Sequence, residues 1–162
     1  MTIMKLKASV FDELYTPPEV TKALIKHLPS SFNTVWCPCD TSDSNIVNEL
    51  EGSGYKVIAS HIKDGKDFLE WEPSEEYDCI ITNPPYSAKN VFIERCVELK
   101  KPWALLLPLD SLCGSKRFSL TSSAGCITIA HRIDFTGKGA NWFYNVWLCQ
   151  WPEIADKWIK EP

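Results

Sequence analysis

Residues 78–86 read Asp78-Cys79-Ile80-Ile81-Thr82-Asn83-Pro84-Pro85-Tyr86, so that an apolar run passes directly into an asparagine, two prolines and an aromatic residue. The continuous run 79–81 is typical of a strand buried on both faces, as in a parallel sheet covered by helices. Proline has a fixed φ and no N–H, so the two prolines predict a rigid turn that holds its carbonyl groups in place. We therefore expect a central strand at 78–82 with a polar loop, 83–87, at its carboxyl end.

Strands and helices alternate on both sides of this segment. The other strands are expected at 34–37, 56–62, 103–107, 126–133 and 143–151, and helices are expected to start at Thr16, near Ile46, at Ser87 and near Ser115. Thr16 is the expected N-cap of the first helix, with Pro17 at its first position and Glu19 completing a capping box. Pro29 is expected to end that helix, and Ser87 to cap the third. This alternation, ending in two strands, predicts an α/β fold with a mostly parallel sheet and an antiparallel C-terminal strand pair.

Three loops are expected to leave the carboxyl ends of the parallel strands, at 38–44, 63–68 and 83–87. In sheets of this kind ligands bind in the crevice beyond the carboxyl ends. The candidate site residues should therefore come from these loops and from the segment that precedes the first helix.

Composition limits the possible classes of protein. A chain of 162 residues, 44% of them hydrophobic, has room for one domain, 1–162. No apolar run approaches the length of a membrane span, and the N-terminus lacks the features of a signal peptide. Seven scattered cysteines favour reduced thiols and a cytoplasmic protein. The net charge of −4 argues against a large non-specific contact with nucleic acid.

The loop 83–86 resembles the Asp/Asn-Pro-Pro-Tyr/Phe loop of amino-methyltransferases, which include the DNA adenine-N6 enzymes. The resemblance implies a Rossmann-like methyltransferase sandwich with helices on both faces and no separate target-recognition domain. It also implies a catalytic set of Asn83, Pro84, Pro85 and Tyr86. The Asn83 side-chain oxygen and the Pro84 carbonyl would accept the hydrogens of an exocyclic amine, and Tyr86 would stack on a base turned out of its helix. The alternative is a Pro-Pro turn that ends a strand, with Tyr86 in the core.

Other segments match the same family in order along the chain. Leu14-Tyr15-Thr16-Pro17 looks like its Tyr/Phe-Thr-Pro element, and Asp67-Phe68 looks like its Asp-Phe segment, whose Asp binds the cofactor's adenine. The segments 103–108 and 132–135 resemble the strand after the catalytic loop and an Arg-Ile-x-Phe stretch before the final strand. Taken alone, the first segment fits an ordinary capped helix start better, and the second fits a surface turn with a buried Phe equally well.

The chain departs from the family at the first cofactor loop. Where the family has Asp-Pro-x-x-Gly-Ser-Gly, this chain reads Cys37-Pro38-Cys39-Asp40-Thr41-Ser42-Asp43. Two glycines that would let the backbone approach the cofactor are replaced, so the pocket should be narrower or the loop remodelled. His61 stands where an acid would bind the ribose. A similar run occurs in phage and prophage proteins that resemble adenine methyltransferases. A metal site at the Cys-x-Cys pair is a weaker reading than buried cysteines, and no metal is expected.

The resemblance thus implies an S-adenosylmethionine-dependent methyltransferase that acts on an exocyclic amino group, with adenine N6 in DNA as the favoured acceptor. Its partners would be nucleic acid and a possible specificity chain, and the alternatives are RNA, a protein glutamine, or a catalytically silent binding module. The cofactor-binding residues implied are Tyr15, Thr16, Pro17, Pro38, Asp40, Thr41, Ser42, Asp43, His61, Asp67 and Phe68.

Overall fold

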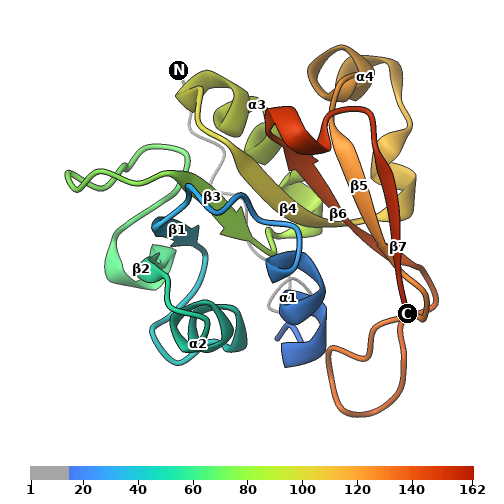
Figure 1. The fold of residues 1–162 in the computed structure, drawn as a ribbon, viewed down its shortest axis with the longest axis horizontal. Helices are drawn as coiled ribbons and strands as arrows, with labels where there is room; N and C mark the ends of the chain where they lie inside the picture. The colour runs from blue at the N-terminus through green and yellow to red at the C-terminus, as the bar shows by residue number, and fades with distance from the viewer. Residues whose placement is uncertain (1–14) are drawn as a thin grey trace.

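The computed structural model describes residues 15–162, which form a seven-stranded sheet with helices on both faces (Figure 1). The strands are β1 (Thr34–Pro38), β2 (Lys56–Ser60), β3 (Cys79–Thr82), β4 (Trp103–Pro108), β5 (Gly125–Ile129), β6 (Asn145–Gln150) and β7 (Trp158–Glu161). The α-helices are α1 (Pro18–Ile25), α2 (Asn45–Gly52), α3 (Lys89–Leu99) and α4 (Ser115–Thr121). The α/β fold expected from the sequence is confirmed.

The strand order is β2-β1-β3-β4-β6-β5-β7. Strands β1 to β4 are mutually parallel, β6 is antiparallel to both β4 and β5, and β7 is parallel to β5. The expected antiparallel pair near the C-terminus is therefore present as β5 and β6. The chain order reverses around β1, which has β2 on one side and β3 on the other, and ligands in open α/β sheets bind at such a switch point.

The sheet separates two apolar layers. Successive side chains of a strand point to opposite faces, so Val35 and Cys37 pack in the layer with α1 and α2, while Trp36 packs in the layer with α3. Trp36, Trp103 and Trp147 are among the largest fully buried side chains. Helices α1 and α2 therefore cover one face and α3 the other, which holds the strand ends in fixed positions.

Two helix starts differ from the prediction. Helix α1 begins at Pro18 with Pro17 as its N-cap and no side-chain cap, so the capping box from Thr16 to Glu19 does not form. Thr16 is 4% exposed, and its hydroxyl accepts a hydrogen bond from Asn83 instead. The prediction for Ser87 was also wrong, because the 3₁₀ turn η2 (Tyr86–Ala88) follows the two prolines and Ala88 is the N-cap of α3.

The bounds of several other elements also differ from the prediction. Helix α1 ends at Ile25, and β2 ends at Ser60 because the 3₁₀ turn η1 (Ile62–Asp64) follows it. Strand β5 ends at Ile129 and β6 starts at Asn145, so 130–144 is a long loop. The edge strand β7 was not predicted. No helix within residues 15–162 has the length and apolar character that crossing a membrane requires.

Candidate functional site

The loops after β1 and β3 are joined by one buried threonine at the switch point. Thr82, the last residue of β3, is fully buried, and its hydroxyl lies within hydrogen-bonding distance of the Pro38 carbonyl. The same hydroxyl is 3.0 Å from Oδ2 of Asp40. The polar end of β3 therefore fixes the position of the loop that follows β1.

Thr16 connects a third segment to the same place. The Asn83 side chain donates from Nδ2 to the Thr16 hydroxyl over 3.2 Å, and Asn45 donates from Nδ2 to the Thr16 carbonyl over 3.0 Å. Asn45 is the first residue of α2. The segment before α1, the start of α2 and the loop after β3 are thus held together, and the Asn83 amide is oriented with its nitrogen toward Thr16.

These three segments and the turn after β2 surround one cavity. Its lining residues are Tyr15, Thr16, Cys39, Asp40, Thr41, Ser44, Asn45, Ile46, His61, Ile62, Lys63, Asn83 and Pro85. Seven of the residues singled out from the sequence lie in this lining, from four separate parts of the chain. The prediction that the loops at the carboxyl ends of the strands come together is confirmed for 38–44 and 83–87, because both contribute to one cavity wall.

The other candidate residues lie outside this lining. Pro17 caps α1, Pro38 and Pro84 are buried at strand ends, and Ser42 is exposed. Phe68 is 3% exposed, and its ring stacks on Phe92 with centroids 4.8 Å apart, so this ring belongs to the core. Leu14 of the first matched segment lies outside the described residues.

Two aspartates of the set are engaged locally. The Thr41 hydroxyl donates to the Asp43 carboxylate, which lowers the pKa of that exposed group. Asp67 accepts the Leu69 N–H over 3.0 Å, and it is close enough to Cys39 to contribute to the raised pKa of that buried thiol. Asp67 therefore lies near the cavity wall formed by Cys39 without being part of it.

Asp40 is the buried ionisable group of the cavity. It is 9% exposed, and burial raises its pKa to about 7, although hydrogen bonds from Ser44 and Thr82 act in the opposite direction. The preceding residue, Cys39, has a φ of +72°, a left-handed conformation that normally favours glycine. The loop after β1 thus adopts a left-handed conformation at Cys39, which is not a glycine, and the next residue, Asp40, is turned inward.

His61 presents a hydrogen-bond donor to the cavity. Its Nδ1 accepts the N–H of Lys63 over 3.1 Å and so caps the turn η1. In a neutral imidazole the other nitrogen, Nε2, then carries the proton. The ring of His61, which lines the cavity, is thus left with a hydrogen-bond donor rather than an acceptor.

Tyr86 follows Pro85 of the lining and packs in an aromatic cluster outside it. Its hydroxyl accepts a hydrogen bond from Asn145 Nδ2 over 2.8 Å, and burial raises the pKa of the phenol above its usual value. Its ring meets Phe143 edge-to-face, with centroids 5.9 Å apart. Tyr86 is therefore held neutral and in one orientation by residues that precede and begin β6.

Several cavity residues were not identified from the sequence, namely Cys39, Ser44, Asn45, Ile46, Ile62 and Lys63. The start of α2 could have been found, since Ser44 is a good N-cap residue that follows a polar loop at a strand end; its side chain does accept the Val47 N–H. The residues 62–63 gave no signal, because they had been assigned to a strand and a loop rather than to the turn η1.

No protein-family model matches the sequence, and no curated protein is significantly similar to it. Among solved structures, a Listeria monocytogenes protein assigned to the class I S-adenosylmethionine-dependent methyltransferases aligns with a TM-score of 0.56 at 14% identity, over 90% of this chain and 63% of its own. The 23S rRNA methyltransferase ErmE aligns with a TM-score of 0.52 at 11% identity, over 85% of this chain and 69% of its own. The chain thus spans less than two thirds of the Listeria protein, and the likeness is one of fold.

Proposed function

We propose that this chain is an S-adenosylmethionine-dependent methyltransferase that acts on the exocyclic amino group of a nucleobase, with adenine N6 as the acceptor. The observation that carries the proposal is that Asn83 and Pro85 line the same cavity as Asp40, Thr41 and His61. A methyl-donor pocket and a loop suited to hold an amine thus share one wall at the switch point of the sheet. The fold likeness to class I methyltransferases supports the same reaction class.

The residues of the cavity fit the chemical groups of S-adenosylmethionine. The first residues of α2, Asn45 and Ile46, line the cavity, and a helix N-terminus favours a carboxylate. The imidazole of His61 can donate to a ribose hydroxyl, and the Asp40 carboxyl can face a positively charged group of the cofactor. When bound, the cofactor supplies a methyl group on a sulfonium sulfur. We assign Tyr15, Thr16, Asp40, Thr41 and His61 to this pocket, and Asp67 to its adenine end.

The loop 83–86 would position the acceptor. An adenine amino group is a weak nucleophile because its lone pair is delocalised into the ring. Hydrogen bonds from this amine to Asn83 Oδ1 and the Pro84 carbonyl favour a pyramidal nitrogen whose lone pair faces the cavity. Asn83 and Pro84 would hold the amine so that its lone pair faces the methyl group that the bound cofactor would supply, and the product amine would release a proton to solvent. The rate would come from positioning, since no strong base is needed.

A second candidate function is a binding module that kept the fold and lost the reaction. The left-handed backbone at Cys39 and the hydrogen bond that ties Thr41 to Asp43 favour it, because both arise where the family has a glycine-rich loop. Thermal unfolding with cofactor separates the two. A ligand at about a hundred times its dissociation constant stabilises the folded chain by roughly 2.7 kcal/mol. An unchanged transition at millimolar S-adenosylmethionine and S-adenosylhomocysteine would favour the silent module.

The transfer itself is tested with methyl-labelled cofactor and separate pools of DNA, RNA and protein. We expect label in adenine N6 of nucleic acid, with DNA as the first expectation. Asn83→Ala should still bind cofactor, more weakly than the wild type because the hydrogen bond to Thr16 is lost, and it should lose transfer even at saturating cofactor. Asn83→Asp should keep part of the transfer, because a carboxylate oxygen also accepts from the amine. Full transfer by Asn83→Ala would remove the proposed acceptor site.

A further inference from the structure

Two exposed aromatic side chains lie next to the acceptor loop. Trp142 is 85% exposed and Tyr144 is 49% exposed, while Phe143 between them is half-buried. Large aromatic side chains normally bury most of their surface, because burial removes their apolar area from water. A tryptophan and a tyrosine on one short exposed run therefore indicate a surface that something else covers.

The run is connected ring by ring to the proposed acceptor site. Trp142 meets Phe143 edge-to-face with centroids 5.2 Å apart, and Phe143 meets Tyr86 at 5.9 Å. The next residue along the chain, Asn145, donates its hydrogen bond to the Tyr86 hydroxyl. In addition, the Tyr144 carbonyl accepts the Leu109 N–H over 2.9 Å. The exposed rings are thus fixed relative to the loop 83–86.

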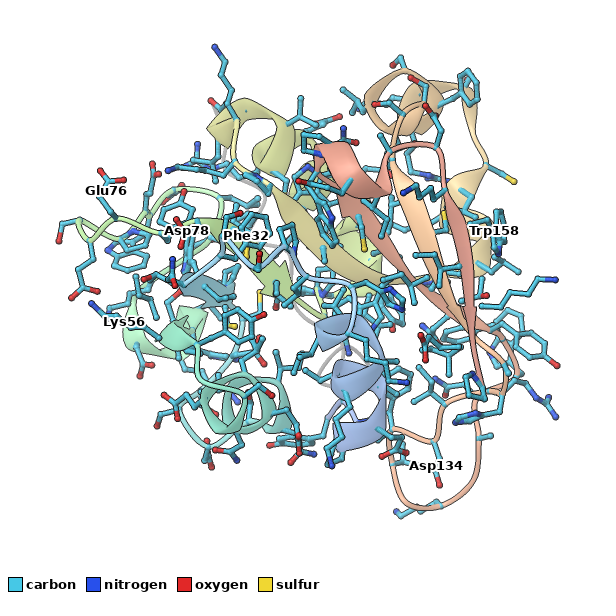
Figure 2. All side chains as sticks on the ribbon, viewed as in Figure 1. Phe32, Lys56, Glu76, Asp78, Asp134 and Trp158 are labelled. Atoms are coloured by element: carbon cyan, nitrogen blue, oxygen red, sulfur yellow. The ribbon has the colours of Figure 1, made fainter. Side chains whose placement is uncertain are left out.

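The loop that carries these rings is internally ordered. Ile133 and Phe135 are buried in the core and hold its base. The Asp134 carboxylate accepts the backbone N–H groups of Thr136, Gly137 and Gly139 over 2.8–3.0 Å, which also lowers the pKa of Asp134. The remainder of the loop projects from the sheet (Figure 2). Little conformational entropy would be lost when a ligand binds a loop of this kind.

The loop is also positively charged on its exposed side. Arg132 and Lys138 are exposed, and among residues 15–162 neither takes part in an ion pair. The loop leaves the carboxyl end of β5, which runs in the direction of β4, so it lies at the same edge of the sheet as the cavity. Flat exposed rings with nearby cations are the combination that binds unpaired nucleotides, because bases stack on the rings and phosphates approach the cations.

Resting on the proposed function, we propose that Trp142 and Tyr144 stack on unpaired nucleotides that flank the acceptor base, so that the substrate is a single-stranded nucleic acid. A duplex would have to be opened at a cost of a few kcal/mol, and enzymes offset that cost with extensive phosphate contacts. The chain has a net charge of −4 and offers only two exposed cations on this loop. An unpaired strand, RNA or DNA, requires neither the opening nor the large basic surface.

The test is equilibrium binding of fluorescent oligonucleotides of one sequence as single-stranded RNA, single-stranded DNA and DNA duplex. We expect one or both single strands to bind more tightly than the duplex, and Trp142→Ala to weaken that binding about tenfold. The matched control is Trp158→Ala, because Trp158 is 57% exposed but pairs with Cys126 at the amino end of β5, far from the loop (Figure 2). Tighter binding of the duplex, or equal effects of the two tryptophan substitutions, would contradict the proposal.

The same variant separates this proposal from the proposed function. Trp142→Ala should leave S-adenosylmethionine affinity and methyl transfer to free adenosine unchanged, while it raises KM for a single-stranded oligonucleotide with little change in kcat. If cofactor binds and transfer occurs but Trp142→Ala leaves KM unaltered, only the stacking surface is wrong. If no cofactor binds, oligonucleotide affinity still tests the surface, and the methyltransferase proposal fails alone.

Discussion

At the scale of single residues, the site depends on polar groups that have been taken out of water at the ends of β1 and β3. Thr82 is fully buried, yet its hydroxyl faces both the Pro38 carbonyl and the Asp40 carboxyl. Buried polar groups of this kind are costly when a partner is removed, because the remaining group stays desolvated. Substitutions at these positions should therefore affect stability and cofactor affinity together.

Asp40 should make the folded chain less stable as pH rises from about 4 to about 7. The folded state keeps its proton up to about pH 7, because burial raises the pKa, while the unfolded chain ionises near 4. The free energy of unfolding of Asp40→Asn should therefore be higher than that of the wild type by about 2–4 kcal/mol at pH 8. At pH 4 the two values should differ little. Urea denaturation at both pH values measures this, with exposed Asp110→Asn as control. Parallel pH profiles for wild type and Asp40→Asn would refute it.

Thr82→Val should remove the hydrogen bonds that connect the loops after β1 and β3, while it keeps the side-chain volume. The substitution leaves the Pro38 carbonyl and Asp40 without their shared partner, at a cost of about 1–3 kcal/mol in unfolding free energy. S-adenosylmethionine affinity should fall as well, which calorimetry measures. Thr128→Val is the control, since it loses a hydrogen bond to the Ile159 carbonyl away from the cavity and should leave affinity unchanged. Equal S-adenosylmethionine affinities in both variants would show that the Thr82 hydrogen bonds do not maintain the shape of the pocket.

At the scale of elements, the buried strands and the edge strand β2 were predictable, and the edge strand β7 was not. Strands β3 and β4 are continuous apolar runs, buried along their whole length, so their pattern has one interpretation. The edge strand β7 is four residues long and mostly exposed, and such a segment carries no periodic signal. Thr16 was assigned as an N-cap because local sequence favoured it, but the hydrogen bond from Asn83, 67 residues away, determines its position.

Gly125 should be essential for the packing of the C-terminal elements. A Cβ at this first residue of β5 would lie 2.1 Å from the backbone carbonyl oxygen of Ile154, in the turn that leads to β7. Gly125→Ala should therefore lower the unfolding free energy by about 3 kcal/mol, since backbone has to move. Gly52→Ala, at the end of α2 with nothing within 4 Å, should be neutral or slightly stabilising. Denaturation midpoints compare the two, and similar values would contradict the packing described.

At the scale of the whole molecule, the topology brings together segments that lie far apart in the sequence. The switch point could be anticipated from the strand–helix alternation, and with it the proximity of 38–44 and 83–87. The turn η1 after His61 and the junction of Tyr86 with the 142–144 aromatic run were not predicted. The junction depends on side-chain contacts between distant segments, which no local pattern encodes. Six of the thirteen lining residues were identified only from the structure.

The two ends of the described chain are joined by a charged cluster. Glu161 of β7 accepts from Lys26 Nζ over 2.7 Å and lies 2.6 Å from His27 Nε2, and these contacts lower the pKa of Glu161. A carboxylate whose pKa is lower in the folded chain than in the unfolded chain stabilises the fold at pH values above its unfolded pKa. This stabilisation is lost as the pH falls through the folded pKa. Glu161→Gln should therefore lower the melting temperature by a few degrees at pH 7 and by less at pH 3, unlike exposed Glu153→Gln. A melting-temperature difference that does not shrink on acidification would exclude this ion cluster as the cause.

The role of the cavity is tested most directly by calorimetric titration of S-adenosylmethionine into the wild-type chain and into Thr16→Ala. This substitution removes the hydroxyl that accepts from Asn83 at the cavity wall and keeps the carbonyl that accepts from Asn45. We predict saturable binding at one site in the wild type and clearly weaker binding in Thr16→Ala. Absence of binding to the wild type at millimolar cofactor, or binding that Thr16→Ala leaves unchanged, would contradict the claim that the cavity beside Asn83 is a methyl-donor pocket.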